Sequence, residues 1–517
     1  MSTRPNLLLI TTDQQRWDTL SLYGQPGYRT PVLDRLAANG RCFDRAYCPS
    51  PICTPSRVAM LTGQYPSRNG AHTIGVTPAF RDPTLPQLLS AHGYASAMIG
   101  KTHFASRGIE AKHTAGRYAP DPAQADPPDA FWHSYDGPYL GFDFVRVGWG
   151  HTNERIPGEH YRAWLQRQGV NFDRVHRVHP MEPHRKLPGG EDVIETGLWS
   201  NLPERYHKTA WITEETIGFA ERQQVAGKPW FCWTSFEDPH FPFVCPDPYF
   251  SAVDMSAVRL HRHTPGEFDD RPPFYKRYYE TGQWHDGARD FFDGISVPAC
   301  RRNQWVEARS DTQAYIGMCN MLDVYVGRIV ERLERIGALE NTLLIFTSDH
   351  GEYLGHHGFW GKGLPAYEDV HRVPCVAHWP AGMANAPKGR TEALFSLVDI
   401  PQTFLDAAGV PAAVGMQGVS QLPVLRGESS GARDWALIEN HATPRVYQQS
   451  FVTRTHKLVV YRDAEYGELY DLSADPEQTA NLWSRAEHAA LREQLLRRFL
   501  QANMAKDGIQ PKRLYGA

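Results

Sequence analysis

Short runs of apolar residues recur along roughly the first 400 residues, and each run ends at a polar or charged side chain. The four longest runs cover residues 7–12, 94–99, 230–236 and 342–347. They are short, uninterrupted and apolar, which is the pattern of strands that are buried on both faces of a parallel sheet. Two shorter runs predict further strands at residues 41–47 and 373–379.

Segments with apolar residues at helical spacing alternate with these strands. They cover residues 30–40, 84–92, 208–225, 311–336 and 397–408. A glycine stands at or just after the end of each segment, as is typical of helix C-termini. The alternation predicts an α/β fold with a large, mostly parallel central sheet flanked by helices.

The pattern changes near residue 425. Short alternating runs at residues 435–439, 449–453, 457–461 and 468–472 have the spacing of an antiparallel meander. A helical segment at residues 486–504 follows them. We therefore predict a catalytic α/β domain at residues 1–425 and a smaller C-terminal α+β subdomain with an antiparallel sheet at residues 426–517.

Two stretches of the large domain show no regular periodicity. They cover about residues 105–206 and 250–310 and are rich in proline, glycine and aromatic residues. Loops of this length inside a compact domain are usually functional or disordered, and the aromatic content favours ordered loops. We interpret both as loop insertions that line a pocket or contact another copy of the chain, so a homo-oligomer is one expectation.

Composition excludes several classes of function. The formal net charge of −4 gives no electrostatic case for binding nucleic acid or an anionic membrane. No apolar stretch approaches the ~18 residues of a membrane span. Residues 6–10 are too short an apolar run for a signal peptide. The eight cysteines form no C-x-x-C pair, so we predict a reduced, cytoplasmic chain.

The stretch at residues 53–57, which reads Cys-Thr-Pro-Ser-Arg, contains a candidate nucleophile. Pro55 suits the first turn of a helix, and Thr54 can cap it. Cys53 is then expected at a helix N-terminus, where free N–H groups and the helix dipole favour an anion. Arg57 adds a cation one turn later. The alternative is a buried cysteine before an ordinary helix, and so short a motif does not decide between them.

Polar side chains follow the four long strands at the point where each strand ends. Because the carboxyl ends of parallel strands share one edge of a sheet, we expect these side chains to lie close together. Cys53 and Lys362 are expected to join them from adjoining loops. The side chains at the strand ends are Asp13, Gln14, Lys101, His103, His240, Asp349 and His350.

Two kinds of chemistry are combined at this edge. Asp13, Gln14 and Asp349 supply the oxygen ligands that suit Ca²⁺, Mg²⁺ or Mn²⁺, and His350 shifts the choice toward Mn²⁺ or another transition metal. We therefore predict a site for one divalent metal ion. The remaining cations and donors, which suit the transfer of a sulfuryl or phosphoryl group, are Arg57, Lys101, His103, His240 and Lys362.

These residues resemble the type I sulfatases of the alkaline phosphatase superfamily. The likeness is close at residues 53–63, which are similar to the signature for oxidising a cysteine to formylglycine. It covers most of the chain except the two insertions, and it implies an alkaline-phosphatase-like fold. Further similar motifs stand at residues 100–103, 239–242, 348–351, 361–362 and 468–472.

The resemblance also implies a mechanism and a maturation partner. A formylglycine-generating enzyme would convert Cys53 to formylglycine, and the hydrate of that aldehyde would be the nucleophile. Residue 53 would then join Asp13, Gln14, Asp349 and His350 around one Ca²⁺ or Mn²⁺ ion. By the same resemblance Arg57 holds the hydrate, Lys101 and Lys362 bind ester oxygens, His103 assists product release, and His240 protonates the leaving oxygen, alone or with Lys362.

Two departures from the usual family pattern point to one branch of it. The common Asp-Asp pair is Asp13-Gln14 here, and the common Asp-Asn pair is Asp349-His350, as in a branch that includes choline sulfatases and phosphonate monoester hydrolases. Lys101 and His103 favour a sulfatase, because the phosphonate monoester hydrolases have Tyr and Thr at those places.

Three functions are therefore considered. The first is a metal-dependent hydrolase of small sulfate esters that uses formylglycine. The second is a phosphonate monoester or phosphodiester hydrolase of the same superfamily with promiscuous sulfatase activity. The third is a catalytically silent binding protein that keeps the fold and has an unmodified Cys53.

Overall fold

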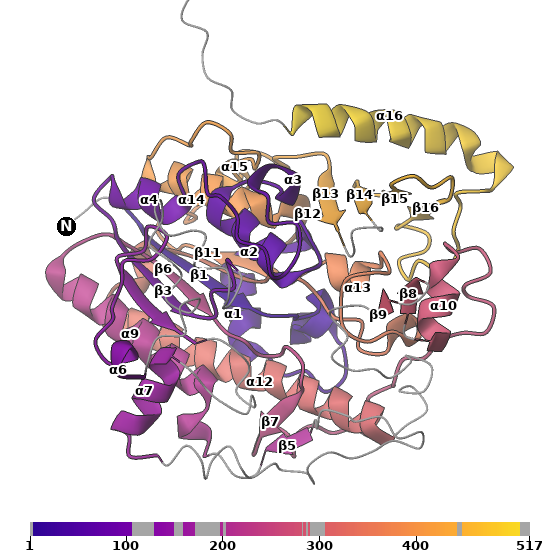
Figure 1. Cartoon of the computed structure of the whole chain (residues 1–517). Coiled ribbons are helices and arrows are strands. Elements are labelled where there is room, and N and C mark those ends of the chain that lie inside the picture. Colours follow the sequence, from indigo (N-terminus) through magenta and orange to yellow (C-terminus); the bar gives the residue numbers. More distant parts are fainter. Residues whose placement is uncertain are drawn as a thin grey trace, which may run out of the picture.

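The computed structural model describes residues 4–105, 129–148, 159–170, 197–199, 203–281, 283–285, 288–289, 306–441 and 447–506. Much of the two expected loop insertions, at about residues 105–206 and 250–310, lies outside these residues. The described part contains the whole central sheet, the C-terminal sheet and the helices that cover them (Figure 1).

An eight-stranded sheet forms the centre of the molecule, in the order β12-β2-β11-β10-β1-β6-β3-β4. Every neighbouring pair is parallel except the two pairs that β11 makes, with β10 and with β2. The predicted large, mostly parallel sheet is therefore confirmed. The strands are β1 (Asn6–Thr12), β2 (Arg41–Tyr47), β3 (Ala95–Gly100), β4 (Phe144–Val147), β6 (Trp230–Ser235), β10 (Thr342–Ser348), β11 (Cys375–His378) and β12 (Gly389–Ser396).

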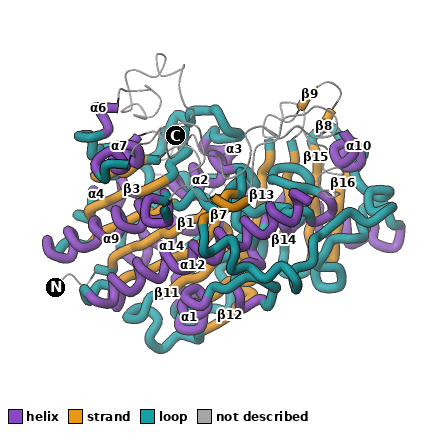
Figure 2. Tube along the Cα trace, turned by 90° about the horizontal axis from the view of Figure 1, so that it is seen from below, coloured by secondary structure: helices purple, strands orange, loops and turns teal. Residues whose placement is uncertain are grey.

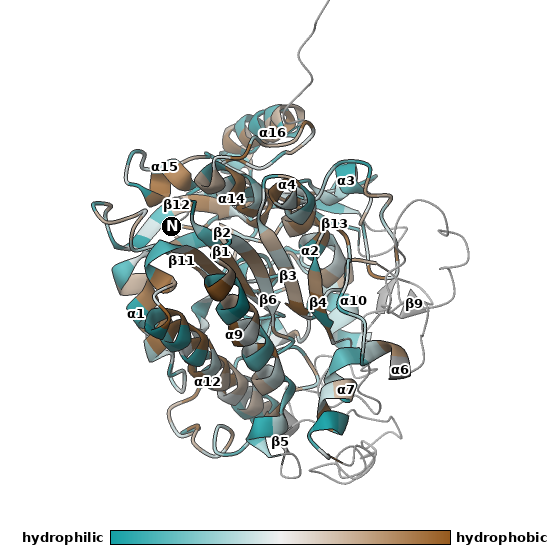
Figure 3. Ribbon diagram, turned by 90° about the vertical axis from the view of Figure 1, so that its left-hand side faces the viewer, coloured by the Kyte–Doolittle hydropathy of each residue, from teal (hydrophilic) through white to brown (hydrophobic). Residues whose placement is uncertain are grey.

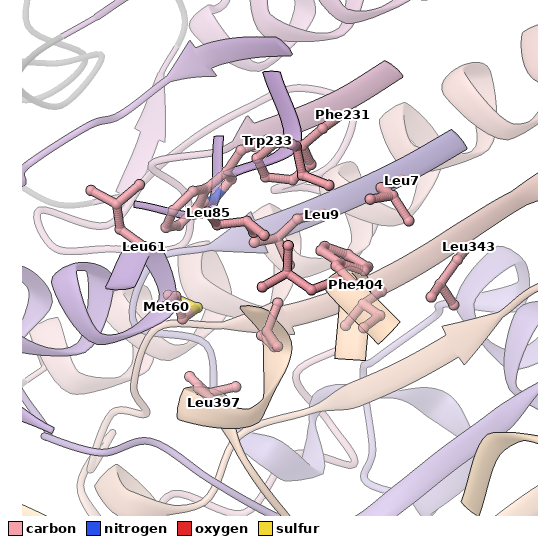
Figure 4. Close-up of a cluster of buried hydrophobic side chains, with 14 of the residues drawn as sticks. Leu7, Leu9, Met60, Leu61, Leu85, Phe231, Trp233, Leu343, Leu397 and Phe404 are labelled. Carbon is pink, nitrogen blue, oxygen red and sulfur yellow. The ribbon is translucent and has the colours of Figure 1, made fainter. Parts of the chain in front are cut away.

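Helices cover both faces of this sheet (Figures 2 and 3). One face carries α1 (Pro31–Asn39), α9 (Lys208–Ala226) and α12 (Val306–Arg335), and the other carries α2 (Cys53–Thr62), α4 (Leu85–Ser90) and α14 (Ile400–Ala408). β1 runs between the two layers. Leu8 and Ile10 pack toward the first layer, whereas Leu7 and Leu9 pack toward the second (Figure 4).

Complete burial explains why the sequence pattern of β1 is continuous and does not alternate. From Leu7 onward every residue of β1 is buried, because helices lie on both sides of it. Each fully buried leucine or isoleucine contributes about 1.5–3 kcal/mol relative to an exposed one. β1 is thus a rigid element, and the residues that follow it leave the core from a fixed position.

Two strands of the sheet were not predicted from the sequence. β4 and β12 lie at the two edges of the sheet. Buried and half-buried residues alternate along β4, half-buried and exposed residues alternate over the first half of β12, and the second half of β12 is buried. An edge strand needs no continuous apolar run, so its signal is weak. The reversed direction of β11 also depends on pairing with β10, which the local sequence does not encode.

The C-terminal part of the chain forms a separate four-stranded antiparallel sheet, which confirms the predicted meander. Its strands are β13 (Ala436–Asn440), β14 (Gln448–Val452), β15 (His456–Tyr461) and β16 (Gly467–Asp471). The helix α16 (Ala489–Ala505) lies along this sheet at the top of Figure 1 and packs Leu495 and Ala502 against it.

Shorter elements complete the described part. No helix in it is long and apolar enough to cross a membrane. Its seven cysteines are all free. The short helices are α3 (Pro66–Asn69), α6 (Asp129–Trp132), α7 (Glu159–Arg167), α10 (Phe274–Thr281), α13 (Glu368–His371) and α15 (Leu422–Leu425), and the short strands are β5 (Gly197–Trp199), β7 (Val244–Pro246), β8 (Gln283–His285) and β9 (Ala288–Arg289).

The register of the sheet brings four strand ends to within one residue of one another. Thr12 of β1 pairs with Ser348 of β10, and Gly100 of β3 pairs with Ser235 of β6. The residues that follow these four positions therefore leave the sheet at one edge. This is the edge at which the sequence predicts the site.

Gly100 allows the close approach of β3 and β6 at that edge. Its φ is +100°, and a Cβ there would lie 1.9 Å from the carbonyl oxygen of Ser235. We expect Gly100→Ala to lower the free energy of unfolding by about 1–3 kcal/mol through overpacking, in addition to about 1–2 kcal/mol of left-handed strain. Urea unfolding would measure the loss. Gly93→Ala is the control, because Gly93 also has a positive φ but has open space around its Cβ position; equal losses in the two variants would contradict the steric argument.

Candidate active site

The helix α2 presents its N-terminus at the carboxyl edge of the sheet, and Cys53 is its first residue. The prediction that Thr54 caps the helix is wrong. The N-cap is Ile52, which has an extended backbone and no capping side chain, because the helix begins two residues earlier than a Thr54 cap would place it. Gly63 ends the helix in a left-handed conformation. Every residue of α2 is buried, so the positive end of its dipole lies inside the protein.

Arg57 joins four strand ends through its guanidinium group. Its Nε lies 2.8 Å from Asp349 Oδ2, and its NH2 lies 3.4 Å from Asp13 Oδ2. Its NH1 donates to the hydroxyl of Ser235 at 2.7 Å and to the carbonyl oxygen of Lys101 at 3.0 Å. The side chain is fully buried and each of its three nitrogens has a partner, so Arg57 neutralises the carboxylates and holds the strand ends together.

Four buried side chains form a cluster that could hold one metal ion. Potential ligand atoms of Asp13, Cys53, Asp349 and His350 all lie within 4.8 Å of one another. Cys53 Sγ is 3.2 Å from His350 Nε2 and 3.6 Å from Asp13 Oδ1. His350 Nδ1 donates to the carbonyl oxygen of Gly351 at 3.0 Å, which directs Nε2 toward the cluster. The donor set therefore fits a divalent cation.

Gln14 stands beside this cluster in a strained backbone conformation. Its φ is +66°, which is uncommon for a residue with a side chain. Its N–H donates to Asp349 Oδ1 at 3.1 Å, and its carbonyl oxygen accepts from Tyr315 at 2.8 Å. Its side-chain Nε2 donates to Glu352, whereas its Oε1 is buried with no hydrogen-bond donor among the described residues. A neutral oxygen left in this way suits a cation.

Lys362 closes the site from the loop after β10. Its Nζ lies 2.8 Å from Cys53 Sγ, 2.7 Å from His240 Nε2 and 3.2 Å from His350 Nε2. His240 donates its Nδ1–H to the carbonyl oxygen of Phe241, so its Nε2 carries the lone pair that faces the Lys362 ammonium. Burial and Lys362 lower the pKa of His240 to about 4, so His240 is neutral at neutral pH.

The charges of the site favour an anion at residue 53. Burial raises the pKa of the Cys53 thiol, but Lys362, Lys101 and His350 outweigh burial and hold the pKa well below its usual range. Lys101 Nζ lies 2.5 Å from Asp13 Oδ2. Burial lowers the pKa of Lys101, but Asp13 and Cys53 raise it above its usual range, so Lys101 stays charged.

His103 reaches the same point from the end of β3. It has a left-handed backbone with a φ of +53°, and its side chain hydrogen-bonds to Cys53. Burial lowers its pKa below the ordinary value, which favours a neutral imidazole. The structure thus brings together all the side chains that the sequence proposed for one site, namely Asp13, Gln14, Cys53, Arg57, Lys101, His103, His240, Asp349, His350 and Lys362.

The sequence prediction missed several supporting residues. Ser235 binds Arg57, and Ser56 donates to the carbonyl oxygen of Asp349 at 2.6 Å. Tyr315 matched the apolar spacing of α12, so the pattern assigned it to the core. Glu352 stands next to the predicted motif at residues 348–351, and its position there was the only signal that could have drawn attention to it.

Comparison with known families agrees with this geometry. The family model described as sulfatase matches residues 5–410. A second family model, described as the C-terminal part of N-sulphoglucosamine sulphohydrolase, matches residues 355–505. The first match includes every residue of the site, and the second includes Lys362 and the antiparallel sheet.

Individual relatives are similar along nearly the whole chain. An N-acetylglucosamine-6-O-sulfatase of Bacteroides thetaiotaomicron is 27% identical in an alignment 515 positions long, which covers 95% of this chain and 85% of the relative. The multifunctional alkaline phosphatase superfamily protein PehA of Trinickia caryophylli is 28% identical over 95% of this chain and 93% of its own. The crystal structure of a phosphonate monoester hydrolase of Agrobacterium radiobacter has a TM-score of 0.76 and 25% identity, and it covers 97% of this chain and 96% of its own.

The low pKa of His240 predicts acid lability. An ordinary histidine has a pKa of 6.5, whereas His240 in the folded protein has a pKa of about 4. Between these values the unfolded state binds the proton and the folded state does not, so stability present above pH 6.5 is lost as the pH falls toward 4. The full shift corresponds to about 3 kcal/mol.

The measurement is urea unfolding of metal-free protein between pH 4.5 and 7. The slope of stability against pH should be shallower in His240→Asn than in the wild type. His92→Asn is the control because His92 is exposed, and its slope should match the wild type. Identical slopes for His240→Asn and wild type would show that His240 is not held neutral.

Proposed function

We propose that this chain, which belongs to the sulfatase family, hydrolyses sulfate esters of small molecules with a formylglycine hydrate derived from Cys53 and one divalent metal ion. Membership of the family makes the protein a sulfuric ester hydrolase, and its relatives lie in the alkaline phosphatase superfamily. The observation that carries the finer proposal is the convergence of Lys362, His350 and Asp13 on the Sγ atom of residue 53.

The position of residue 53 favours an oxygen nucleophile. Sγ marks the place where the oxygens of a hydrated aldehyde on the same Cβ would lie, among a metal cluster and an ammonium group. The hydrate supplies an attacking hydroxyl and a second hydroxyl through which the bound sulfate can be released. Cys53 is fully buried in the fold, so a separate formylglycine-generating enzyme would need to reach it before the chain folds around it.

A metal ion fits the residues around residue 53. Asp13, Asp349 and His350 would hold it with the modified residue 53, and the unpaired Oε1 of Gln14 would complete the set. When bound, Ca²⁺ or Mn²⁺ would supply positive charge to the ester oxygens and lower the pKa of a coordinated hydroxyl. The buried carboxylates of Asp13 and Asp349 offer the negative charge that such an ion requires.

The cations around the site suit the negative ester group. Lys101 and Lys362 lie on two sides of residue 53, since Lys101 contacts Asp13 and Lys362 contacts Sγ. They would bind the oxygens of a sulfate ester and stabilise the charge that moves onto the leaving oxygen. Arg57 is engaged with Asp13 and Asp349 and with groups at two other strand ends, so its role is to hold residue 53 and the metal ligands in place.

The hydrogen bonds of His240 favour Lys362 as the proton donor for the leaving oxygen. His240 is neutral, and its Nε2 accepts from Lys362. Lys362 therefore carries the transferable proton, and His240 orients the ammonium group. His103 hydrogen-bonds to residue 53 and, as a neutral imidazole, can accept the proton that is lost when the sulfate is released.

A phosphonate monoester or phosphodiester hydrolase with promiscuous sulfatase activity is the second candidate. Two observations favour it: the whole-chain similarity to the phosphonate monoester hydrolase of Agrobacterium radiobacter, and Gln14 in the metal set. Gln14 brings no negative charge, which eases the binding of a phosphoryl group. The pair Lys101 and His103 favours the sulfatase.

A substrate panel distinguishes the two candidates. The wild-type protein, produced in a host that forms formylglycine, should show an aldehyde or its hydrate at residue 53 by peptide mass spectrometry. Its kcat/KM should be highest for an aryl sulfate and should fall when EDTA removes the metal. A preference of orders of magnitude for the phosphonate monoester over the sulfate ester would establish the second candidate instead.

Removal of the nucleophile is the matched control in that panel. Cys53→Ala should lower kcat/KM at least about a thousandfold, because the hydroxyl that attacks is lost. An unmodified Cys53 in protein with full activity would contradict the proposed chemistry.

The role of Lys362 predicts a dependence on the leaving group. Lys362→Ala should lower kcat about 10²–10⁴-fold for an alkyl sulfate, whose leaving oxygen needs a proton. The loss should be much smaller for 4-nitrophenyl sulfate, whose leaving group is stable as an anion. Lys101→Ala should lower the rates for both substrates by similar factors, since Lys101 binds the ester group. An equal loss for the two substrates in Lys362→Ala would rule out proton donation by Lys362.

A further inference from the structure

We propose that Glu352 is a positioning residue that turns the amide of Gln14 toward the metal and also holds the loop that carries Lys362. Glu352 follows β10 by four residues and is fully buried. The inference rests on the proposed function, because it assumes a metal ion at the cluster of Asp13, Cys53, Asp349 and His350.

The first contact of Glu352 sets the orientation of Gln14. Oε2 of Glu352 accepts a hydrogen bond from Nε2 of Gln14. An ionised carboxylate only accepts, so Gln14 must turn its NH2 group to Glu352 and its Oε1 away from it. That Oε1 atom is buried with no donor among the described residues. The carboxylate therefore selects the amide orientation in which an oxygen is left for a cation.

The second set of contacts fixes the loop of Lys362. Oε1 of Glu352 accepts from the N–H of Leu354 at 2.9 Å and from the N–H of Gly361 at 2.6 Å. The carbonyl oxygen of Gly361 accepts from the N–H of Tyr353 at 3.1 Å, so Gly361 is held at both its N–H and its carbonyl oxygen. Lys362 is the next residue, and its Nζ lies 2.8 Å from Cys53 Sγ.

Glu352 acts through these neighbours and not on the substrate. Both of its oxygens accept hydrogen bonds from the protein, and it lies outside the cluster of potential metal ligands found among the described residues. The buried carboxylate of Glu352 thus links Gln14, the proposed metal ligand after β1, to the loop after β10 that carries Lys362.

The variant Glu352→Gln tests the orientation of Gln14. Its new amide can keep its oxygen on the two backbone N–H groups, but its NH2 then faces the NH2 of Gln14. Gln14 must turn over and present NH2 to the metal. We expect the Kd for Mn²⁺ to rise about 10–100-fold, as for other residues that orient metal ligands. Isothermal titration of metal-free protein measures this without any turnover.

A compensating change makes the test specific. Gln14→Glu alone places two carboxylates together and should weaken Mn²⁺ binding or leave it unimproved. The double variant Gln14→Glu/Glu352→Gln restores one donor facing one acceptor and leaves an oxygen for the metal. If the two single changes acted independently, the fold changes in Kd for Mn²⁺ would multiply. The Kd of the double variant should be lower than that product by about tenfold or more, a coupling of about 1.4 kcal/mol. Additive effects in this cycle would overturn the inference.

Two further variants separate positioning from general destabilisation. Glu468→Gln removes another buried carboxylate that accepts only from tyrosine hydroxyls in the described structure, and it should leave the Kd for Mn²⁺ unchanged. Glu352→Asp keeps a charged acceptor and should bind Mn²⁺ at least about tenfold more tightly than Glu352→Gln. All variants are compared as folded metal-free proteins by circular dichroism.

The outcomes distinguish this inference from the proposed function. A wild-type protein that binds neither Mn²⁺ nor Ca²⁺ would contradict the proposed function itself. A wild-type protein that binds Mn²⁺, together with an unchanged Kd in Glu352→Gln, would overturn only the role of Glu352.

Discussion

The buried ion pairs of Arg57 are the interaction on which the rest of the site depends. Two carboxylates, Asp13 and Asp349, lie fully buried at the ends of adjacent parallel strands. Unpaired carboxylates in such a place would cost several kcal/mol each. Arg57, a residue of α2, offsets this cost by pairing with both carboxylates. Cys53 lies at the N-terminus of the same helix, next to these carboxylates. The residue that neutralises the metal ligands therefore also places the nucleophile.

The fold limits where such an arrangement can form. Parallel strands all point their carboxyl ends to one edge, and helices on both faces bury the strands completely. Side chains that follow β1, β3, β6 and β10 consequently converge because the parallel strands all end at the same edge. The strained backbones of Gln14 and His103 stand at this edge, which is where strain is expected to be retained for function.

The C-terminal antiparallel sheet also supports this edge. Lys457 of β15 is fully buried and lies 3.1 Å from a carboxylate oxygen of Glu368, which also accepts from the hydroxyl of Tyr47. Gln478 accepts from the backbone N–H of Glu368 at 2.6 Å. Glu368 begins α13, whose backbone binds the first residues of the loop after β10. Residues of and just after the C-terminal sheet thus help to hold the segment that carries His350 and Lys362.

The sequence by itself determined the class of fold and the composition of the site. Continuous apolar runs predict strands covered on both faces, and the polar side chains that follow parallel strands emerge at one shared edge. Asp13, Lys101, His240 and Asp349 could therefore be named in advance. Tertiary structure alone decided the rest. The direction of β11, the edge strands β4 and β12, and the contacts that turn Gln14 and fix Lys362 join segments that are far apart along the chain. Hydrogen-bond geometry between such segments leaves no local pattern, because it depends on where the whole sheet places them.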